Sequence, residues 1–424
     1  MRTLRGQRLE GENFEGRYII ADIQIKQRAQ SRTRPVERRA LFDPDCRRGG
    51  TVLIHEQPDH IWRIDYQLRP GETEAEALTE SSIRASIQAV LDDLGWSEPW
   101  ELEWWSIYSA NTLALQDYRD DAIFYIGDSA HIVPIFGVRG LNNGLADAQN
   151  IGWKLGALIQ GHAAPALLDS YTPERRGATL DVFANASKSS RFMTPPTRGW
   201  TLMRDAALSL ALRHPFAGEF ANPRNMTPYT YADSPLVTPD PDHWQGGAVP
   251  GSIAPNVQTA NGHLSDLLGP AFTLLVFGHV PQPRPHPLLQ VVHFAPDSPV
   301  AAAYDAADGA AVLIRPDMHV AARWKHAKTV DIENALKRGL GHAVPSPSPH
   351  DPAGLSNVLH ATTMNNPHPN PDMEDVYAAL AQTMDQIGPE REALFLSKLA
   401  LLMAQHATNP GQVIDWIVQA RQDL

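Results

Sequence analysis

The chain has 424 residues, and at about 150 residues per domain this length predicts about three domains. Apolar residues make up 43% and charged residues 20% of the sequence, an ordinary globular composition that excludes a disordered, collagenous or fibrous chain. The formal net charge is −12, with 48 acidic against 36 basic residues, so the charge balance argues against nucleic acid as a partner.

Cys46 is the single cysteine of the sequence. It excludes an internal disulfide framework, a cysteine-based zinc site and a Cys-x-x-Cys redox pair. The first residues are rich in arginine and contain no apolar run as long as that of a secretory signal, and no stretch approaches the roughly 18 apolar residues of a membrane-spanning helix. We therefore expect a cytoplasmic protein.

Short runs that are punctuated by Gly and Pro occupy residues 17–118 and predict a mostly antiparallel layer. The expected strands are Tyr18–Ile25, Thr51–His55, Ile61–Leu68 and Trp104–Ser109. Between them, residues 72–94 carry apolar side chains at helical spacing and predict one helix within this layer.

The next segment predicts a strand, a loop and a helix. An apolar run over Ala122–Ile126 predicts a strand that stops at Gly127, and a glycine-rich stretch then opens a helix. The apolar positions of this helix recur at a period of 3.6 residues. They are Leu145, Ala148, Ile151, Leu155 and Leu158. Further helical segments are expected to about residue 213.

Proline makes up 35 of the 424 residues, and two proline-rich stretches predict joints between domains. The first covers residues 235–255, with a boundary near 245, and the second covers 345–371. Apolar runs between them predict the buried strands Phe272–Phe277, Leu288–Phe294 and Ala311–Arg315 of an α/β sandwich. After the second stretch, Met373–Met384 and Glu390–Gln405 predict two helices. The second helix has an apolar face of Leu394, Leu396, Leu399, Leu401 and Leu402.

The segment from Gly127 to Gly144 has the features of a ligand cradle. Asp128 follows the predicted strand, where ligands of open α/β sheets bind, and its carboxylate accepts hydrogen bonds from a sugar or ribityl hydroxyl. Glycines at a helix start expose backbone N–H groups that favour an electron-rich ligand. Two interpretations remain open on these grounds. The segment is either such a cradle, or a tight turn in which Asp128 only caps a helical turn.

The sequence from Gly127 to Leu155, GDSAH…P…GVRGLNNGLADAQNIGWKL, resembles the second flavin motif of class A flavoprotein monooxygenases. These aromatic-ring hydroxylases are typified by 4-hydroxybenzoate, phenol and 3-(3-hydroxyphenyl)propionate hydroxylases. The resemblance implies that Asp128 bonds the ribityl chain of FAD, that Pro134 lies beside the flavin, and that a helix start directs its amides at the pyrimidine edge. The implied cofactor-binding residues are Gly127, Asp128, Pro134, Gly137, Gly140, Leu141 and Asn142.

Other parts of the chain extend the resemblance. The runs from Val52 and Ile61 look like the substrate-domain sheet of the family, 167–176 looks like the stretch after the flavin helix, and 251–320 is similar to the thioredoxin-like domain of the phenol-hydroxylase branch. The fold class implied is α/β and α+β, with a partial FAD/substrate domain of the 4-hydroxybenzoate hydroxylase type, a thioredoxin-like C-terminal domain and a small helical tail. The expected division is a substrate-domain sheet portion over 1–118, a C-terminal part of the FAD-binding domain with connecting helices over 119–245, a thioredoxin-like domain over 246–340, a Pro-rich linker over 341–371 and a helical tail over 372–424.

A complete enzyme of this family opens with a strand and GxGxxG, which seats the pyrophosphate of the dinucleotide. No GxGxxG follows a strand in this sequence. We therefore expect either a start that was placed too late or a truncated descendant, with FAD binding weakened. The competing hypothesis is a non-catalytic remnant that serves as a binding or oligomerisation module.

Several polar residues are weaker candidates. His55, Glu56 and His60 suggest a metal pair, but the sequence has no HExxH and strand alternation separates the faces of adjacent residues, so no metal is expected. His131 is interpreted as a structural or flavin-proximal residue rather than a general base. The thioredoxin-like segment contains no cysteine between residues 240 and 340, which excludes a dithiol role there.

The expected substrate sheet contributes three more residues. Arg63 and Asp65 share one face of it and Tyr66 takes the other, and either a cross-strand ion pair or a substrate contact fits the first two. Trp104 and Trp105 are expected to line a core or a pocket wall.

Taken with the resemblance, the sequence predicts an FAD-dependent monooxygenase that hydroxylates a phenolic or aromatic compound with NADPH or NADH and O2. The expected partners are a small aromatic substrate and a second copy in a homodimer, without nucleic acid or membrane. No catalytic residue is assigned.

Overall fold

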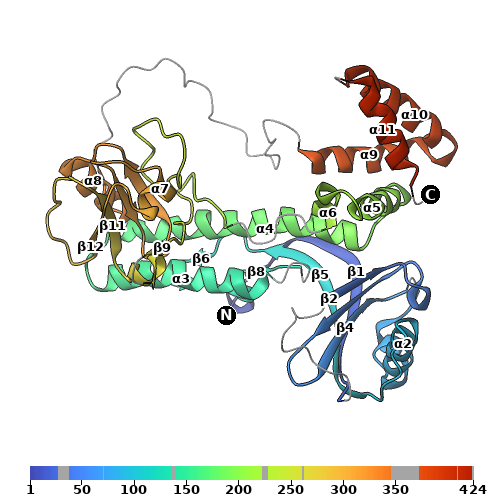
Figure 1. Ribbon diagram of the computed structural model, residues 1–424. Coiled ribbons are helices and arrows are strands. Elements are labelled where there is room, and N and C mark those ends of the chain that lie inside the picture. Colours follow the sequence, from blue (N-terminus) through green and yellow to red (C-terminus); the bar gives the residue numbers. More distant parts are fainter. Residues whose placement is uncertain are drawn as a thin grey trace.

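The structure, a computed structural model, describes residues 1–26, 38–69, 71–134, 139–221, 228–259, 262–344, 372–407 and 409–422. Two long helices, α3 (Gly140–Ile159) and α4 (Tyr171–Met193), run side by side through its middle (Figure 1). A β-sheet unit lies at one end of this pair and an α/β unit at the other, so the helices connect them.

The first unit is a six-stranded sheet in the order β2-β3-β4-β1-β5-β8, in which every pair is antiparallel. Its strands are β1 (Glu10–Gln24), β2 (Arg38–Phe42), β3 (Thr51–Glu56), β4 (Ile61–Gln67), β5 (Glu101–Ala114) and β8 (His131–Ile132). The four predicted strands are all present, and β2 and β8 are additional edge strands. The two longest, β1 and β5, extend from the sheet toward α3 (Figure 1).

One face of this sheet is covered by helix α2 (Glu80–Asp93). Because side chains alternate along a strand, Ile19, Ile64 and Tyr66 point toward this helix, where they pack with Ile83 and other apolar residues. The predicted helix over 72–94 is divided into α1 (Glu74–Ala77) and α2, since Thr79 caps α2 with its side chain. The opposite face of the sheet carries polar residues.

The second unit has a four-stranded sheet in the order β12-β11-β13-β14, in which β11 and β12 are parallel and the other pairs antiparallel. Its elements are β11 (Phe272–Phe277), β12 (Leu289–Phe294), α7 (Pro299–Tyr304), β13 (Ala311–Ile314), β14 (Val320–Trp324) and α8 (Thr329–Gly339), with the small strands β9 (Gln258–Thr259) and β10 (Gly262–His263). The predicted strands are confirmed, and the thioredoxin-like assignment stays a prediction.

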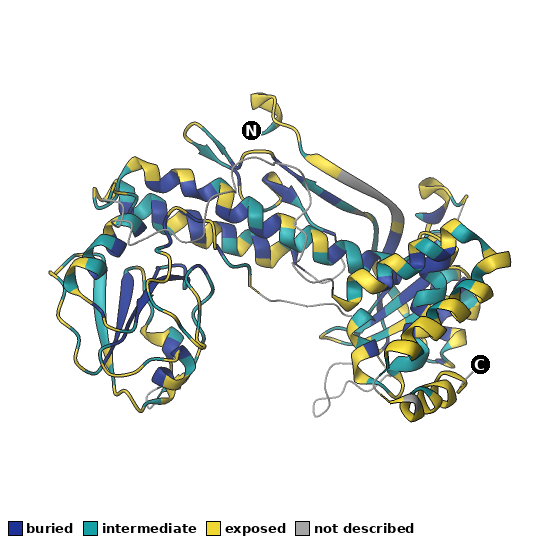
Figure 2. Cartoon of the chain, turned by 90° about the horizontal axis from the view of Figure 1, so that it is seen from above, coloured by how far each residue is buried: buried dark blue, intermediate teal, exposed yellow. Residues whose placement is uncertain are grey.

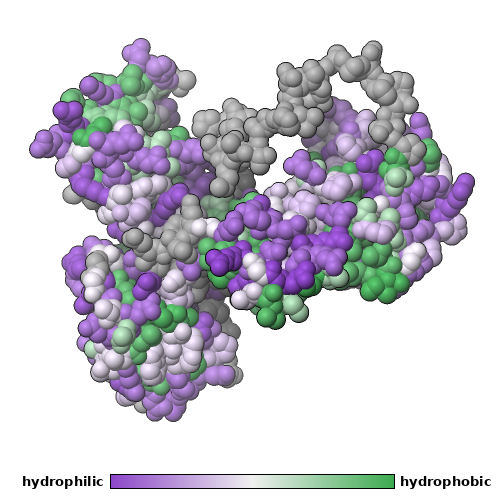
Figure 3. Space-filling view, turned by 180° about the vertical axis from the view of Figure 1, so that it is seen from behind, coloured by the Kyte–Doolittle hydropathy of each residue, from purple (hydrophilic) through white to green (hydrophobic). Residues whose placement is uncertain are grey.

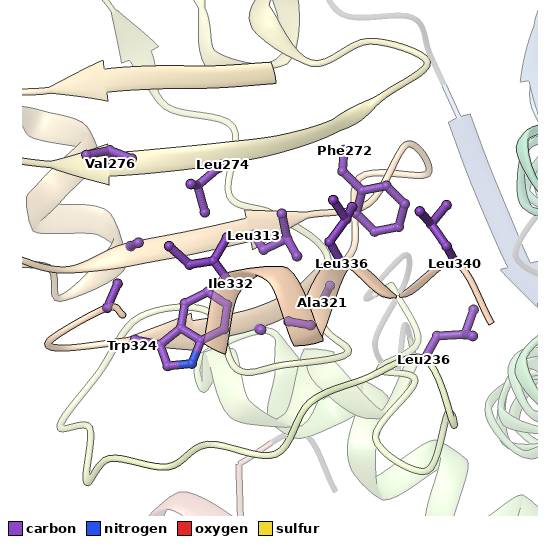
Figure 4. Packing of buried hydrophobic residues seen from close by; sticks show 14 of the residues in the cluster. Leu236, Phe272, Leu274, Val276, Leu313, Ala321, Trp324, Ile332, Leu336 and Leu340 are labelled. Carbon is purple, nitrogen blue, oxygen red and sulfur yellow. The ribbon is translucent and has the colours of Figure 1, made fainter. Parts of the chain in front are cut away.

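Both faces of the second sheet are buried, as expected for a sheet with continuous apolar strands. Figure 4 shows Leu274, Leu313 and Trp324 packed with Ile332 and Leu336 on the α8 side. The other face packs against α7 and includes Leu275, Val312 and Tyr304. This unit therefore has a core on each side of its sheet.

The first proline-rich stretch forms no helix or strand, yet it packs on the second unit. The Thr238 N–H donates to the Ala321 carbonyl at 2.8 Å, and the Arg323 guanidinium binds the Asp240 carboxylate at 2.6 Å. Leu236 is buried in the cluster around α8. The second proline-rich stretch lies, from residue 345 to 371, outside the described residues. The proposed domain boundaries stay predictions.

The tail consists of α9 (Met373–Ile387), α10 (Pro389–His406) and α11 (Pro410–Ala420). Helix α9 packs on α5 (Arg198–Ala211), with α6 (Pro215–Ala221) beside it. The apolar face predicted for α10 is not buried: Leu401 is 72% exposed, and none of the side chains of α10 is buried. Figures 2 and 3 show this exposed, partly apolar surface over the tail helices. In the described part of the chain, no helix is both long and apolar enough to cross a membrane.

The strand predicted over 122–126 is wrong in its extent and its sheet. Only β7 (Ile123–Phe124) is extended, and it pairs with β6 (Arg119–Asp120) in a two-stranded antiparallel ribbon. Asp121, with φ of 57°, turns the chain between them. Among the described strands, β7 pairs with β6 alone, so the apolar residues do not continue an open parallel sheet.

We expect Gly199→Ala to loosen the tail. A Cβ atom at Gly199 would lie well inside van der Waals contact of the Ala381 carbonyl oxygen, so α9 must shift, at a cost of about 2 kcal/mol. Hydrogen exchange of the α9 amides should accelerate in this variant. A matched control is Gly218→Ala in α6, where a Cβ meets nothing within 4 Å. Unchanged α9 exchange in Gly199→Ala would contradict the expected clash.

Candidate functional site

The predicted cradle lies where a tight turn meets the start of α3. Residues Gly127–Ser129 form a single 3-10 turn, and Gly127 has a left-handed φ of 53°. A Cβ atom on Gly144 would lie 3.2 Å from the Cα of Gly127, so turn and helix touch backbone to backbone. Glycine is needed at both positions, at Gly127 for its conformation and at Gly144 for the close approach.

The predicted binding residues are mostly brought together around this contact. Asp128 is exposed in the turn, and Gly140, Leu141 and Asn142 form the first turn of α3, where Leu141 is 74% exposed. Pro134 is buried next to this region in sequence. The remaining residue, Gly137, lies outside the described residues.

Backbone amides of the first turn of α3 are directed out of the helix. The preceding residue contributes no side-chain cap, and amides in a first turn have no carbonyl four residues earlier within the helix. The helix dipole adds partial positive charge at this end. The arrangement therefore favours an electron-rich ligand atom beside Gly140 and Leu141.

Asp147, one helical turn behind Gly144, supports the cradle from inside. Its Oδ2 accepts the Gly127 N–H at 3.0 Å and lies 2.7 Å from Nε2 of His131, and its Oδ1 accepts Nε of Arg175 at 2.7 Å. Burial opposes ionisation of this carboxyl, but the His131 hydrogen bond and the Arg175 charge outweigh burial and hold its pKa below the usual value. Asp147 therefore fixes the turn to the helix as an anion.

Arg175 on α4 extends this contact. Its guanidinium donates to Oδ1 of Asn143 at 2.6 Å and to the Tyr231 hydroxyl at 2.9 Å. The amide of Asn143 in turn donates to the Thr179 hydroxyl at 3.0 Å. His131 is buried against Asp147, an arrangement that agrees with its interpretation as a structural or flavin-proximal residue.

A second buried ionic group joins α3 and α4 to the α/β unit. Glu174 accepts Nζ of Lys154 at 2.7 Å and Nη1 of Arg315 at 2.6 Å, and Arg315 also binds Asp317 at 2.6 Å. Asn150 donates to both carboxylates, at 2.8 and 3.0 Å. Burial would raise the pKa of Glu174, but the Arg315 and Lys154 charges outweigh it and keep that pKa well below its usual value.

Sequence reasoning missed the residues that form the two buried ionic groups around Asp147 and Glu174. It predicted an apolar buried face for α3, but Leu145 is 59% exposed and Ala148 is exposed. The buried stripe is instead largely polar. It contains Asn143, Asp147, Asn150, Ile151, Lys154 and Ala157. The signal was present, because Asn, Asp, Asn and Lys recur at helical spacing, and polar residues at that period predict a hydrogen-bonded interface as readily as a solvated face.

The substrate-sheet residues lie as the alternation predicted. Arg63 and Asp65 share one face, and Arg63 binds Asp22 on the neighbouring strand with two hydrogen bonds of 2.8 Å. Tyr66 points to the opposite face, into the α2 core. Trp105 packs partly on that core and donates its indole N–H to the Leu78 carbonyl at 3.0 Å.

The remaining candidates do not assemble into a site. Trp104 is 49% exposed, so it lines no core. His55 and Glu56 are successive residues of β3 and point to opposite faces. Within the described ranges, no three His, Cys, Asp or Glu side chains are grouped to hold a metal ion.

Comparison with known sequences gives matches over part of the chain. Residues 2–186 match the family model described as "FAD binding domain". A 3-(3-hydroxy-phenyl)propionate/3-hydroxycinnamic acid hydroxylase of Klebsiella pneumoniae (strain ATCC 700721 / MGH 78578) is 30% identical over 233 residues, covering 53% of this chain and 41% of that protein. A protein of the same description from Burkholderia vietnamiensis is 33% identical over 151 residues, covering 35% and 24%. The chain thus spans less than half the length of these relatives.

Solved structures share the fold. The flavin-dependent monooxygenase PieE, in complex with FAD and substrate, aligns with a TM-score of 0.62 and 18% identity over 80% of this chain and 67% of that chain. Aklavinone-11 hydroxylase, with FAD and aklavinone, aligns with a TM-score of 0.61 and 21% identity over 80% and 65%. At these identities the similarity establishes the fold.

We expect Asp147→Asn to destabilise the protein by about 3 kcal/mol, because the amide leaves Arg175 buried without its counter-charge. Asp128→Asn, at an exposed position in the adjoining turn, should change stability by less than about 0.5 kcal/mol. Urea unfolding followed by circular dichroism measures both. Equal unfolding midpoints for the two variants would contradict a supporting role for Asp147.

Proposed function

We propose a function from the family of this chain, whose residues 2–186 belong to the FAD-binding domain of the class A flavoprotein monooxygenases. The protein acts as an FAD-dependent monooxygenase that hydroxylates a phenolic or other aromatic compound with NADPH or NADH and O2. The observation that supports this most directly is the backbone contact of Gly127 with Gly144. This contact places the exposed carboxylate of Asp128 next to the backbone amides at the start of α3.

The residues of the cradle fit the flavin end of FAD. Asp128 is positioned to accept a hydrogen bond from a ribityl hydroxyl, and the amides of Gly140 and Leu141 are positioned for the oxygen-bearing pyrimidine edge. Pro134 would lie beside the ring, and Asn142 completes the helix start. When bound, FAD supplies the transfer of electrons from NAD(P)H and the activation of O2.

The chain's own groups hold and orient this flavin end. Asp147 keeps the Gly127 turn against α3, so the carboxylate of Asp128 and the helix amides keep a fixed separation. A site fixed in this way loses little conformational freedom when a ligand binds. The aromatic substrate is proposed from the names of the relatives, which act on 3-hydroxyphenyl compounds.

The proposed cradle contacts the isoalloxazine and the ribityl chain. The GxGxxG motif, which binds a pyrophosphate, does not occur in the sequence. We therefore expect the chain to bind riboflavin about as tightly as FAD. Titration of the full chain with each flavin, followed by quenching of flavin fluorescence, measures this. A preparation that remains colourless in excess of both flavins would contradict the proposed function.

Asp128→Ala should weaken flavin binding by about tenfold, because a hydrogen bond to a charged acceptor contributes about 1.5 kcal/mol or more. Asp92→Ala on the exposed side of α2 is the matched control and should bind flavin like the wild type. A phenol should stimulate NAD(P)H oxidation by the flavin-loaded chain, measured as loss of absorbance at the nicotinamide band. Equal flavin affinities of the two variants would contradict a role of Asp128 in flavin binding.

A further inference from the structure

The last two helices of the tail, α10 and α11, expose large apolar side chains to solvent. Figure 2 shows both helices exposed over most of their length. The side chains concerned, which together are called the tail surface, are Leu394, Leu396, Leu401, Leu402, Met403, Ile414, Trp416, Ile417 and Val418. Helices of soluble proteins normally bury such residues against a core. Within the described part of the chain, no other element covers the tail surface.

Helix α11 shows most directly that a partner is required. Ile414, Ile417 and Val418 follow one another at helical spacing and form an apolar stripe, whereas Asp415 and Gln419 lie on the other side of the helix. Ile417 is 61% exposed, and none of the described side chains of α11 is buried. A helix of 11 residues is marginal in water without tertiary packing. Contacts from outside the chain would therefore stabilise it.

The size of the tail surface suits an interface between two copies of the chain. Its side chains are between 40% and 72% exposed, and at roughly 60–120 Å² of apolar area for each fully exposed side chain they present on the order of 500 Å². A standard interface takes about 800 Å² from each partner, of which about 65% is apolar in homodimers. That apolar share is also roughly 500 Å².

The charge distribution favours the same region. The whole chain has a net charge of −12, so two copies repel each other over most of their surface. Residues 389–422 are neutral, because three acidic residues are balanced by three basic ones. These are Glu390, Glu392 and Asp415 against Arg391, Lys398 and Arg421. Two copies therefore approach here at little electrostatic cost, and the region lacks the cluster of Lys and Arg that attracts anionic lipid.

We propose that α10 and α11 form the contact surface of a homodimer, in which the tail surface of one copy packs against the same surface of a second copy. A two-fold interface uses one self-complementary surface twice, and two helices from each copy form a four-helix bundle. Helix α9 packs on α5, and Glu392 of α10 binds Arg198 of α5, so the bundle is fixed to the rest of each chain. The proposal does not depend on flavin binding.

Sedimentation equilibrium of the full chain tests the proposal. The wild type should associate to a species of twice 46.7 kDa. Ile417→Glu should raise the dissociation constant of the dimer at least a hundredfold, because the charge enters a two-fold interface twice. Gln419→Glu is the matched control, since it places the same charge on the polar side of the same helix, and it should leave the dissociation constant unchanged.

Two further variants separate loss of the interface from other effects. Ile159→Glu, at an 81% exposed position at the end of α3, should remain as dimeric as the wild type. Circular dichroism shows whether Ile417→Glu keeps its helix content. If it does not, Ile417→Ala decides, because alanine favours the helix and removes only the apolar contact. This variant should raise the dissociation constant at least tenfold.

A wild-type chain that stays monomeric at every concentration, or associates to a larger species, overturns the proposal. So does a dimer whose dissociation constant is the same in Ile417→Glu and Gln419→Glu. A monomeric chain that co-sediments with vesicles of phosphatidylcholine and phosphatidylglycerol also overturns it, and would assign the tail surface to a lipid surface. Loss of flavin binding alone contradicts the proposed function and leaves the dimer in place.

Discussion

The structure depends on the pairing of buried charges along two helices. Asp147 on α3 and Glu174 on α4 are both almost fully buried, and each is satisfied by cations and by hydrogen-bond donors. A buried anion is tolerated only when it is paired in this way, because removing one partner leaves an uncompensated charge. The two groups therefore allow a single arrangement in which the Gly127 turn, α3, α4 and the α/β unit are held together.

That constraint explains why the candidate cradle is rigid although its surface is exposed. The amides of α3 and the Asp128 turn lie at the solvent side, and the contacts that fix them lie one turn deeper, at Asp147 and Arg175. Arg175 continues to the Tyr231 hydroxyl, and Tyr231 stacks on His319 of the α/β unit with centroids 4.2 Å apart. A continuous set of polar and stacking contacts thus connects the cradle with the α/β unit.

Periodicity of apolar residues predicted most of the strands and helices, because β1, β4 and α2 bury their apolar residues on one face. It failed on α3, where the buried residues are mostly polar. The stripe of Asn143, Asp147 and Lys154 on α3 is buried only because its partners on α4 come from distant sequence positions, which no local pattern specifies. The cradle could be predicted from its motif, whereas the carboxylate that holds it could not.

Two of the buried aspartates of this chain, Asp147 and Asp65, show how surroundings decide what a carboxyl can do. Asp147 accepts three donors, which holds its pKa low and leaves no capacity for a ligand. Asp65 is as enclosed but has an oxygen without a partner among the described residues, and burial raises its pKa to about 7. The first therefore stabilises the fold as a permanent anion. The second keeps an oxygen without a described partner, and its desolvation favours the neutral carboxyl.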